Sequence, residues 1–193
     1  MVPPRNLNDF TSWTASVLRL GRGYIAFAPA TRTPERLLEL YEFEGCPFCR
    51  KAREAFSELD LPYVSRTTPK GERVKRARVS ELGGQQMFPF LVDPNTGWSG
   101  HESEDIITYL HTTYGSGRSR VGRALALLNT AGSALASASR IRGNNVHPGC
   151  EDRVQPEQLL ELWSFEASPF CRKAREALCV LNLDYVCHNV AKR

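Results

Sequence analysis

Two cysteines separated by two residues lie where an apolar segment gives way to a helical pattern. Segment 37–43 is rich in Leu, Tyr and Phe, which favours a buried strand, and the residues after the cysteines place apolar side chains on one helical stripe. Pro47 suits the first turn of a helix, because its missing N–H would have no helical partner there. The spacing therefore predicts Cys46 at or near the helix N-cap, where backbone N–H groups and the helix dipole favour a thiolate. Cys49, one turn later, is the natural resolving thiol.

The surroundings of this CxxC motif leave several interpretations to weigh. Arg50 and Lys51 bring positive charge to the first turn, where they either stabilise the thiolate or form a solvated helix face. A structural zinc site needs four ligands, usually as two cysteine pairs, whereas the remaining Cys and His residues are scattered. A structural disulfide is also disfavoured, since this spacing at a strand-to-helix joint is the redox arrangement. The motif therefore predicts a redox pair and no metal.

Composition sets broad limits on the function. The chain has 193 residues, of which 41% are hydrophobic and 24% charged, as in a soluble globular protein of one or two domains. A net charge of +4 does not by itself imply nucleic acid as a partner. No apolar run approaches the about 18 residues that a membrane-spanning helix needs. We therefore expect neither nucleic acid nor a membrane among the partners.

The N-terminal residues 1–34 contain several Arg, Ser and Thr residues and few acidic ones. Such a composition is found in transit peptides, and also in an N-terminal arm of a mature protein. We favour an arm in which Trp13, Val17 and Leu18 form the apolar face of a short helix that packs on the first domain. The expected location is a reducing compartment, the cytoplasm or the plastid stroma.

The residues after the CxxC helix predict the remaining elements of a domain. A second strand near Tyr63 completes a βαβ unit, and the basic segment 69–78 is either a solvated face or a carboxylate-binding edge beside the thiol. Pro89 before a short strand is a candidate for a cis peptide bond. An antiparallel hairpin follows, and then a helix that has Ser103 as its expected N-cap.

Three motifs carry a family resemblance: Gly45 to Cys49, the pair Phe88-Pro89, and Glu102-Ser103. Together they resemble the glutaredoxins and, more closely, the N-terminal domain of glutathione transferases, over about residues 37–114. The resemblance implies an α/β, thioredoxin-like fold of three layers.

The resemblance also implies a glutathione site. In the family, the residue before the proline offers its backbone to the cysteinyl part of glutathione, and the Glu-Ser pair holds the γ-glutamyl end. The implied site beside Cys46 consists of Pro47, Phe48, Arg50, Phe88, Pro89, Glu102 and Ser103. Glutaredoxins usually carry a lysine shortly before the first cysteine, and this chain does not. Lys70 or Arg73 is therefore the expected partner of the glycyl carboxylate.

Residues 156–192 repeat residues 34–70 at an offset of 122, which aligns Cys171 with Cys49. The chain thus resembles tandem thioredoxin-fold proteins of plants, algae and some bacteria. Ser168 stands where the first copy has Cys46, and the second copy has no counterpart of the proline-led hairpin. Such a half-module must dock on a partner. Three arrangements are possible: the chain is a shortened version of a longer protein, the half-module packs on the first domain, or it packs on another copy in a homodimer. We favour the first.

These observations predict an arm over 1–34, a thioredoxin-like domain over 35–115, a helical linker over 116–155 and a partial second βαβ repeat over 156–193. The linker helix is expected within 118–142. The remaining cysteines, which are Cys150, Cys171, Cys179 and Cys187, are expected to be buried or incidental thiols.

The predicted function is that of a glutathione-dependent thiol-disulfide oxidoreductase. Cys46 would attack glutathione mixed disulfides, with glutathione as the co-substrate and glutathionylated or disulfide-bearing proteins as partners. One alternative is a non-catalytic, glutathione-binding or redox-sensing module. Another is an iron–sulfur carrier in which Cys46 thiolates of paired chains and two glutathiones hold a cluster.

Overall fold

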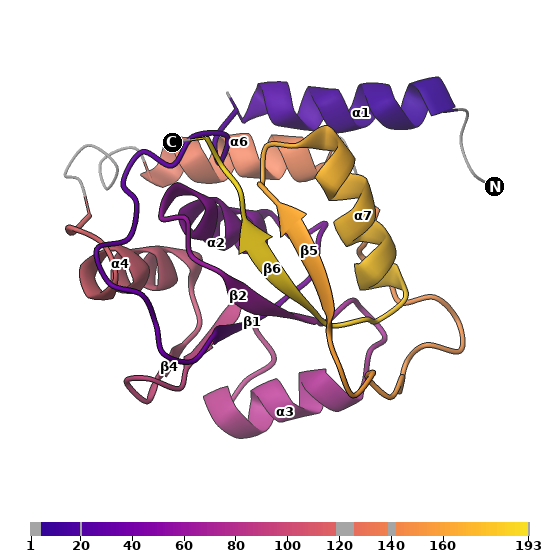
Figure 1. The fold of residues 1–193 in the computed structure, drawn as a ribbon. Helices are drawn as coiled ribbons and strands as arrows, with labels where there is room; N and C mark the ends of the chain where they lie inside the picture. Colours follow the sequence, from indigo (N-terminus) through magenta and orange to yellow (C-terminus); the bar gives the residue numbers. More distant parts are fainter. Residues whose placement is uncertain (1–4, 20, 119–125, 139–141, 193) are drawn as a thin grey trace.

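The computed structural model describes residues 5–19, 21–118, 126–138 and 142–192 as a six-stranded mixed sheet with helices around it (Figure 1). The strand order is β4-β3-β1-β2-β6-β5. Along the chain, the described elements are α1 (Arg5–Leu18), β1 (Leu38–Glu42), α2 (Pro47–Glu58), β2 (Tyr63–Thr67), α3 (Val74–Gly83), β3 (Phe90–Asp93), β4 (Trp98–Gly100), α4 (Ser103–Thr113), α6 (Ala126–Ala138), β5 (Leu160–Ser164), α7 (Pro169–Val180) and β6 (Tyr185–Asn189).

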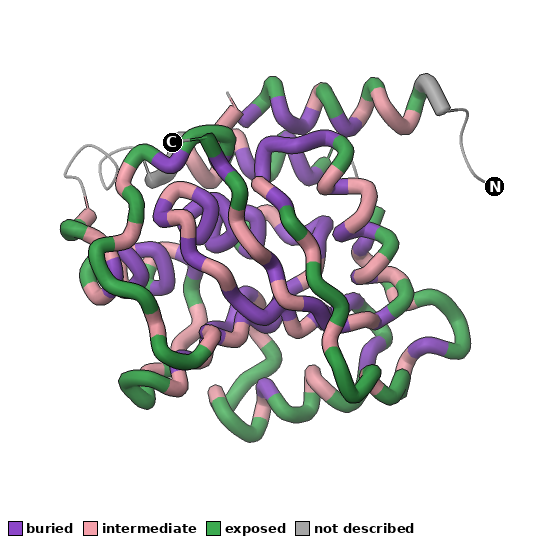
Figure 2. The backbone as a smooth tube through the Cα atoms, viewed as in Figure 1, coloured by how far each residue is buried: buried purple, intermediate pink, exposed green. Residues whose placement is uncertain are grey.

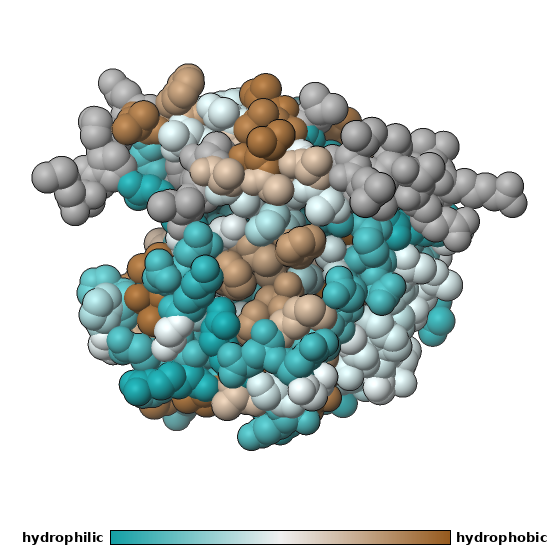
Figure 3. Space-filling view, turned by 180° about the vertical axis from the view of Figure 1, so that it is seen from behind, coloured by the Kyte–Doolittle hydropathy of each residue, from teal (hydrophilic) through white to brown (hydrophobic). Residues whose placement is uncertain are grey.

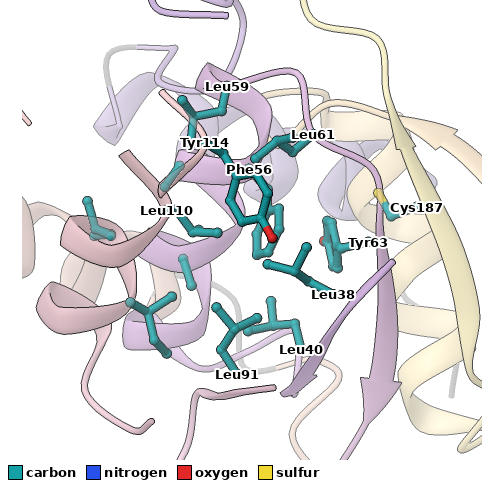
Figure 4. Packing of buried hydrophobic residues seen from close by; sticks show 14 of the residues in the cluster. Leu38, Leu40, Phe56, Leu59, Leu61, Tyr63, Leu91, Leu110, Tyr114 and Cys187 are labelled. Atoms are coloured by element: carbon teal, nitrogen blue, oxygen red, sulfur yellow. The ribbon is translucent and has the colours of Figure 1, made fainter. Parts of the chain in front are cut away.

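The first part of the sheet has the predicted thioredoxin-like order. β1 and β2 are parallel and are joined through α2, while β3 and β4 form the predicted antiparallel hairpin beside β1. Phe56 of α2 stacks on Tyr63 with 4.3 Å between ring centroids, and Leu110 of α4 belongs to the same core (Figure 4). On the other face, Val79 of α3 packs with Tyr41 and Phe90. The expected α/β, three-layer fold is therefore confirmed.

The second βαβ unit extends this sheet. β5 and β6 are parallel, and β6 pairs antiparallel with β2, with Val64 opposite Val186. Tyr63 lies opposite Cys187 and Ser65 opposite Tyr185. Because Tyr185 is the counterpart of Tyr63 and Cys187 that of Ser65 in the repeat, the two equivalent strands pair symmetrically at the joint. Of the docking arrangements considered for the half-module, the structure shows the one on the first domain.

A cluster of buried ion pairs crosses the joint between the two units. Arg53 Nε lies 2.9 Å from Glu166 Oε2, and the equivalent Arg175 Nε lies 3.0 Å from Glu44 Oε2. All four side chains are buried. Charges taken out of water are tolerated only when they are paired in this way. The cluster therefore couples the fold of one unit to that of the other.

The N-terminal arm forms the predicted helix, but its orientation differs from the prediction. α1 lies across the top of the molecule in Figure 1 and contacts α6 and α7. Ser12 and Ser16 face inward, where their hydroxyls donate to the carbonyl oxygens of Pro169 and Ala167 at 2.7 Å. Trp13, Val17 and Leu18, which were expected to pack, are exposed instead. The serines occupy the buried face because their hydroxyls can donate hydrogen bonds to these carbonyl oxygens, which apolar side chains cannot do.

The predicted linker helix is partly described. α6 packs on α1 and α2, while residues 119–125 and 139–141 of the range expected for this helix lie outside the described residues. After it, Asn145 bridges to Lys70 in the same way as Ile25 bridges to Lys192. Each unit is thus flanked by a helix and a short crossing segment.

Burial is concentrated in α2 and in the central strands, whereas α3 and the loop before β5 are largely exposed (Figure 2). The face opposite to the view of Figure 1 has hydrophilic side chains surrounding an apolar area (Figure 3). None of the described helices is long and apolar enough to cross a membrane.

Candidate functional site

Cys46 is the N-cap of α2. Its backbone is extended, with φ −77° and ψ 123°, and Pro47 follows at the start of the helix. The backbone N–H of Cys49 donates to Cys46 Sγ at 3.3 Å. The sulfur therefore takes up a donor that a helix start otherwise leaves without a partner.

The two thiols have opposite electrostatic environments. The hydrogen bond from the Cys49 side chain lowers the pKa of Cys46 below its usual value, aided by the N–H groups of Cys49 and Phe48 and opposed by burial. Burial raises the pKa of Cys49 well above its usual value, and its hydrogen bond to Cys46 adds to this. The pair is thus arranged with the first sulfur as the anion and the second as the protonated donor.

The basic residues of the first turn are not on a solvated face, contrary to one of the two interpretations. Arg50 and Lys51 are only 1% and 2% exposed. Arg50 Nη1 lies 3.7 Å from Glu166 Oε1, and Lys51 Nζ lies 2.5 Å from Glu104 Oε1. Both cations face acidic partners on other elements, while Arg53 is the residue whose charge helps to lower the pKa of Cys46.

The Phe88-Pro89 peptide bond is cis, as the sequence predicted. The Phe88 ring meets the Phe43 ring edge-on, with 6.2 Å between centroids. The guanidinium of Arg76 lies 4.6 Å from the centroid of the Phe88 ring. These contacts bring the segment before β3, the end of β1 and α3 together on one side of the site.

Arg76 is a residue that the sequence analysis did not single out. Its guanidinium donates to the carbonyl oxygens of Pro69 and Thr68, at 2.9 and 2.8 Å, which fixes its position over Phe88. Burial lowers its pKa, whereas the charges of Glu72, Cys49, Cys179 and Cys46 act in the opposite direction. Arg76 is therefore within electrostatic reach of the thiol pair. Only its place in a run of basic residues marked it in the sequence.

The two cations expected to hold the glycyl carboxylate are exposed. Arg73 pairs with Asp152 on the surface, with 2.6 Å between Nη2 and Oδ2. The backbone of Lys70 takes part in the bridge to Asn145, and its side chain is exposed. Because α3 begins at Val74, its first turn turns Arg76 and not Arg73 toward Phe88.

The Glu102-Ser103 pair lies at the start of α4, but the expected N-cap is shifted by one residue. Glu102 is the N-cap, makes no side-chain cap hydrogen bond and has a φ of 64°. Ser103 is the first helical residue and is buried. A non-glycine residue in this left-handed region is strained, and such strain often occurs at functional sites. Glu102 itself is exposed at the start of α4.

The thiol pair is closely covered. Cys46 is 4% exposed, and Ser133 of α6 donates to the carbonyl oxygen of Pro47 at 2.6 Å. The side chain of Asn144 packs against Gly45, where an added Cβ would lie 2.1 Å from its Oδ1. Phe48, in contrast, is exposed beside the motif.

In the second copy, Ser168 is the N-cap of α7. Its Oγ accepts the N–H of Cys171 at 3.2 Å, as Cys46 Sγ accepts that of Cys49. Cys150, Cys179 and Cys187 are buried and Cys171 is partly so, and all of them are free thiols. Among the described parts of the chain, no group of His, Cys, Asp or Glu residues could hold a metal ion.

Comparison with known proteins supports the class that this geometry defines. Residues 40–119 match the glutathione S-transferase N-terminal domain family. The match runs from within β1 to beyond the end of α4, and this part of the chain has the thioredoxin-like fold of that domain family. No curated protein and no solved structure gives a significant match to the chain.

Proposed function

We propose that the protein is a glutathione-dependent thiol-disulfide oxidoreductase with Cys46 as its nucleophile. The observation that carries the proposal is the asymmetry of the thiol pair: the pKa of Cys46 is lowered and that of Cys49 is raised. A thiolate is the attacking species in thiol-disulfide exchange.

The reaction has two exchange steps. The Cys46 thiolate attacks the glutathione sulfur of a glutathionylated protein, so that a Cys46–glutathione disulfide forms and the protein thiolate leaves and takes up a proton. The thiolate of a second glutathione then attacks the glutathione sulfur on Cys46, which releases oxidised glutathione and restores the Cys46 thiolate. Cys49 is the alternative resolving thiol. Its attack on the Cys46 sulfur releases glutathione and leaves an internal Cys46–Cys49 disulfide, which two further glutathione molecules reduce in two exchange steps with release of oxidised glutathione.

The proposed glutathione site follows the family pattern with one change. The backbone of Phe88 pairs with the cysteinyl part, Glu102 and Ser103 hold the γ-glutamyl end, and Pro47 and Phe48 flank the sulfur. Arg76 takes the role of the cation for the glycyl carboxylate, because it is held over Phe88 and lies within electrostatic reach of Cys46. Arg50 supports this glutathione site indirectly, as part of the buried cluster of ion pairs, since it faces Glu166.

The wider setting is part of the same proposal. The thioredoxin-like domain over 35–115 and the βαβ repeat over 156–193 form a tandem, and the protein acts in a reducing compartment such as the cytoplasm or the plastid stroma. Glutathionylated proteins are the substrates, and a homodimer through the second repeat stays a prediction.

A second function is favoured by the burial of Cys46, which is 4% exposed. A covered thiol suits a glutathione-binding or redox-sensing module with little turnover. The test is the reduction of a glutathionylated mixed disulfide, coupled to glutathione reductase, with wild type, Cys46→Ser and Cys49→Ser. Activity that is lost only in Cys46→Ser supports the enzyme with a monothiol mechanism. Saturable glutathione binding without turnover in the wild type would instead establish the binding module.

A further inference from the structure

A cleft lies between α1 and the start of α7, on the second βαβ unit and apart from Cys46. Its volume is about 510 Å³. Small-molecule sites in proteins usually measure roughly 300–1,000 Å³. It is lined by Trp13, Ser16, Val17, Gly21, Tyr24, Phe165, Ala167, Ser168, Pro169 and Phe170.

The walls of the cleft are mainly aromatic. Trp13 meets Phe170 edge-on, with 6.5 Å between centroids, and Tyr24 meets Phe165 in the same way at 5.6 Å. Edge-on pairs leave ring faces free to stack on a third ring. Trp13 and Phe170 are both more than half exposed, so an apolar molecule in the cleft would remove their surface from water.

The polar groups of the cleft are few and carry no charge. Ser16 Oγ already donates to Ala167 O at 2.7 Å. Ser168 Oγ accepts the N–H of Cys171, and its own proton remains able to point to an acceptor on a ligand. At the rim, Lys173 Nζ is paired with Asp9 Oδ1 at 2.5 Å and also lies 5.0 Å from the centroid of the Phe170 ring. Lys192 Nζ lies at the same distance from the centroid of the Tyr24 ring, so each of these two rings has a cation over one face and the other face for a ligand.

Comparison of the two units explains why this site differs from the one at Cys46. In the first unit, Arg76 of α3 brings a cation to the side of the thiol, and Asn144 packs against Gly45. Across the described residues of the second unit, nothing corresponds to α3. Tyr24 takes the place that corresponds to Asn144, because the two residues make equivalent backbone bonds, to Lys192 and Lys70 respectively. The cleft at Ser168 is therefore apolar where the site at Cys46 is charged.

We propose that this cleft binds an uncharged aromatic small molecule, which stacks between the rings of Trp13, Tyr24 and Phe170 and accepts a hydrogen bond from Ser168. The site is independent of the glutathione site proposed above. It gives the second unit a role although that unit lacks the nucleophilic thiol.

The test uses the full chain and the uncharged fluorescent probe N-phenyl-1-naphthylamine. Val17 lines the cleft, and Phe10 lies on the same helix but does not line it; they are 67% and 68% exposed. We expect saturable binding of one probe per chain, weakened at least tenfold in Val17→Asp and changed less than twofold in Phe10→Asp. Val17→Trp, which fills the cleft without adding charge, should also weaken binding tenfold. Circular dichroism verifies that each variant keeps its helices.

Several outcomes would overturn the proposal. Equal losses in Phe10→Asp and Val17→Asp, for the probe or for phosphatidylcholine vesicles, would show that the exposed side of α1 binds apolar surfaces as a whole. Binding that does not saturate would show unspecific adsorption. Tighter binding of the anionic 1-anilinonaphthalene-8-sulfonate than of the uncharged probe would show that Lys192 or Lys173 selects an anion.

Discussion

At the residue scale, the chemistry depends on the different environments that the start of α2 gives to the sulfurs of Cys46 and Cys49. Cys46 is the cap and receives hydrogen bonds, whereas Cys49 is inside the helix and is fully buried. The Cys49 side chain is the largest contributor to the lowered pKa of Cys46, ahead of the backbone N–H groups. Arg76 adds a cation that is fixed by two carbonyl groups and a ring.

Alkylation of Cys46 should therefore depend on the donor at position 49. In the wild type, the rate of alkylation by iodoacetamide should rise with pH, and we expect the midpoint of this rise to lie below about pH 8.5, the usual pKa of a free cysteine. Cys49→Ala should raise the midpoint, because the donor is lost, and Cys49→Ser should raise it less, because a hydroxyl still donates. The rate is followed by mass spectrometry of the peptide that contains Cys46. Identical midpoints in the three proteins would contradict this role of Cys49.

Arg76→Ala should weaken glutathione binding by roughly tenfold, since a charge-assisted hydrogen bond contributes about 1.5–3 kcal/mol. Arg76→Lys should restore only part of the affinity, because an ammonium group cannot reproduce the planar stacking on Phe88. Titration calorimetry with glutathione measures both. Arg73→Ala is the matched control, as Arg73 belongs to the same basic run but pairs with Asp152. An equal loss in Arg73→Ala would point to the general charge of the segment.

At the scale of elements, α2 and α7 are linked by charges that cross between the two units: the arginines of each helix face an acidic residue in the loop before the other helix. Arg53 and Arg50 of α2 face Glu166, and Arg175 and Arg172 of α7 face Glu44. Burial alone would raise the pKa of Glu166, but Arg175 and Arg53 lower it strongly, so this carboxylate stays ionised far below its usual range. A group whose pKa is lowered by folding stabilises the fold at neutral pH, and this contribution is lost as the pH falls.

Glu166→Gln should therefore lower the free energy of unfolding by about 3 kcal/mol, because it leaves buried arginines without their counter-charge. Urea unfolding at pH 7 measures the loss, and the difference from wild type should shrink toward acidic pH. Arg78→Ala, which removes one partner of the exposed Arg78–Glu81 pair, should change stability by less than about 0.5 kcal/mol. A loss of similar size in both variants would contradict the importance of the buried cluster.

At the scale of the molecule, one sheet joins two units that have diverged. The first carries the thiol pair, the proline-led hairpin and Arg76, and the second carries Ser168 and an aromatic cleft. β2 and β6 pair at the joint. α6 covers the start of α2, which begins within the CxxC motif, and α1 covers the start of α7, which begins within the SxxC motif. Neither unit buries its part of the joint without the other.

The two units should consequently unfold in one cooperative step. Trp98 reports on the hairpin of the first unit and Trp163 on β5 of the second. Two variants are compared, one with Trp98 and one with Trp163 as its single tryptophan, and Trp13 is replaced in both. Their urea midpoints followed by fluorescence should coincide with each other and with that from circular dichroism. Separate midpoints would show that the pairing of β2 with β6 does not couple the units.

Local sequence determined the elements, the position of Cys46 and the hairpin, because caps, periodicity and turn residues act between near neighbours in the chain. It also revealed the repeat, which is a property of the sequence alone. Tertiary structure decided that Arg50 and Lys51 are buried, that Arg76 and not Arg73 lies over Phe88, and that α1 turns its serines inward. Each of these depends on a partner on another element, such as Glu166 for Arg50 or Pro169 for Ser12. A basic or amphipathic stretch shows its charge and its period, but the face it buries is chosen by whatever packs against it.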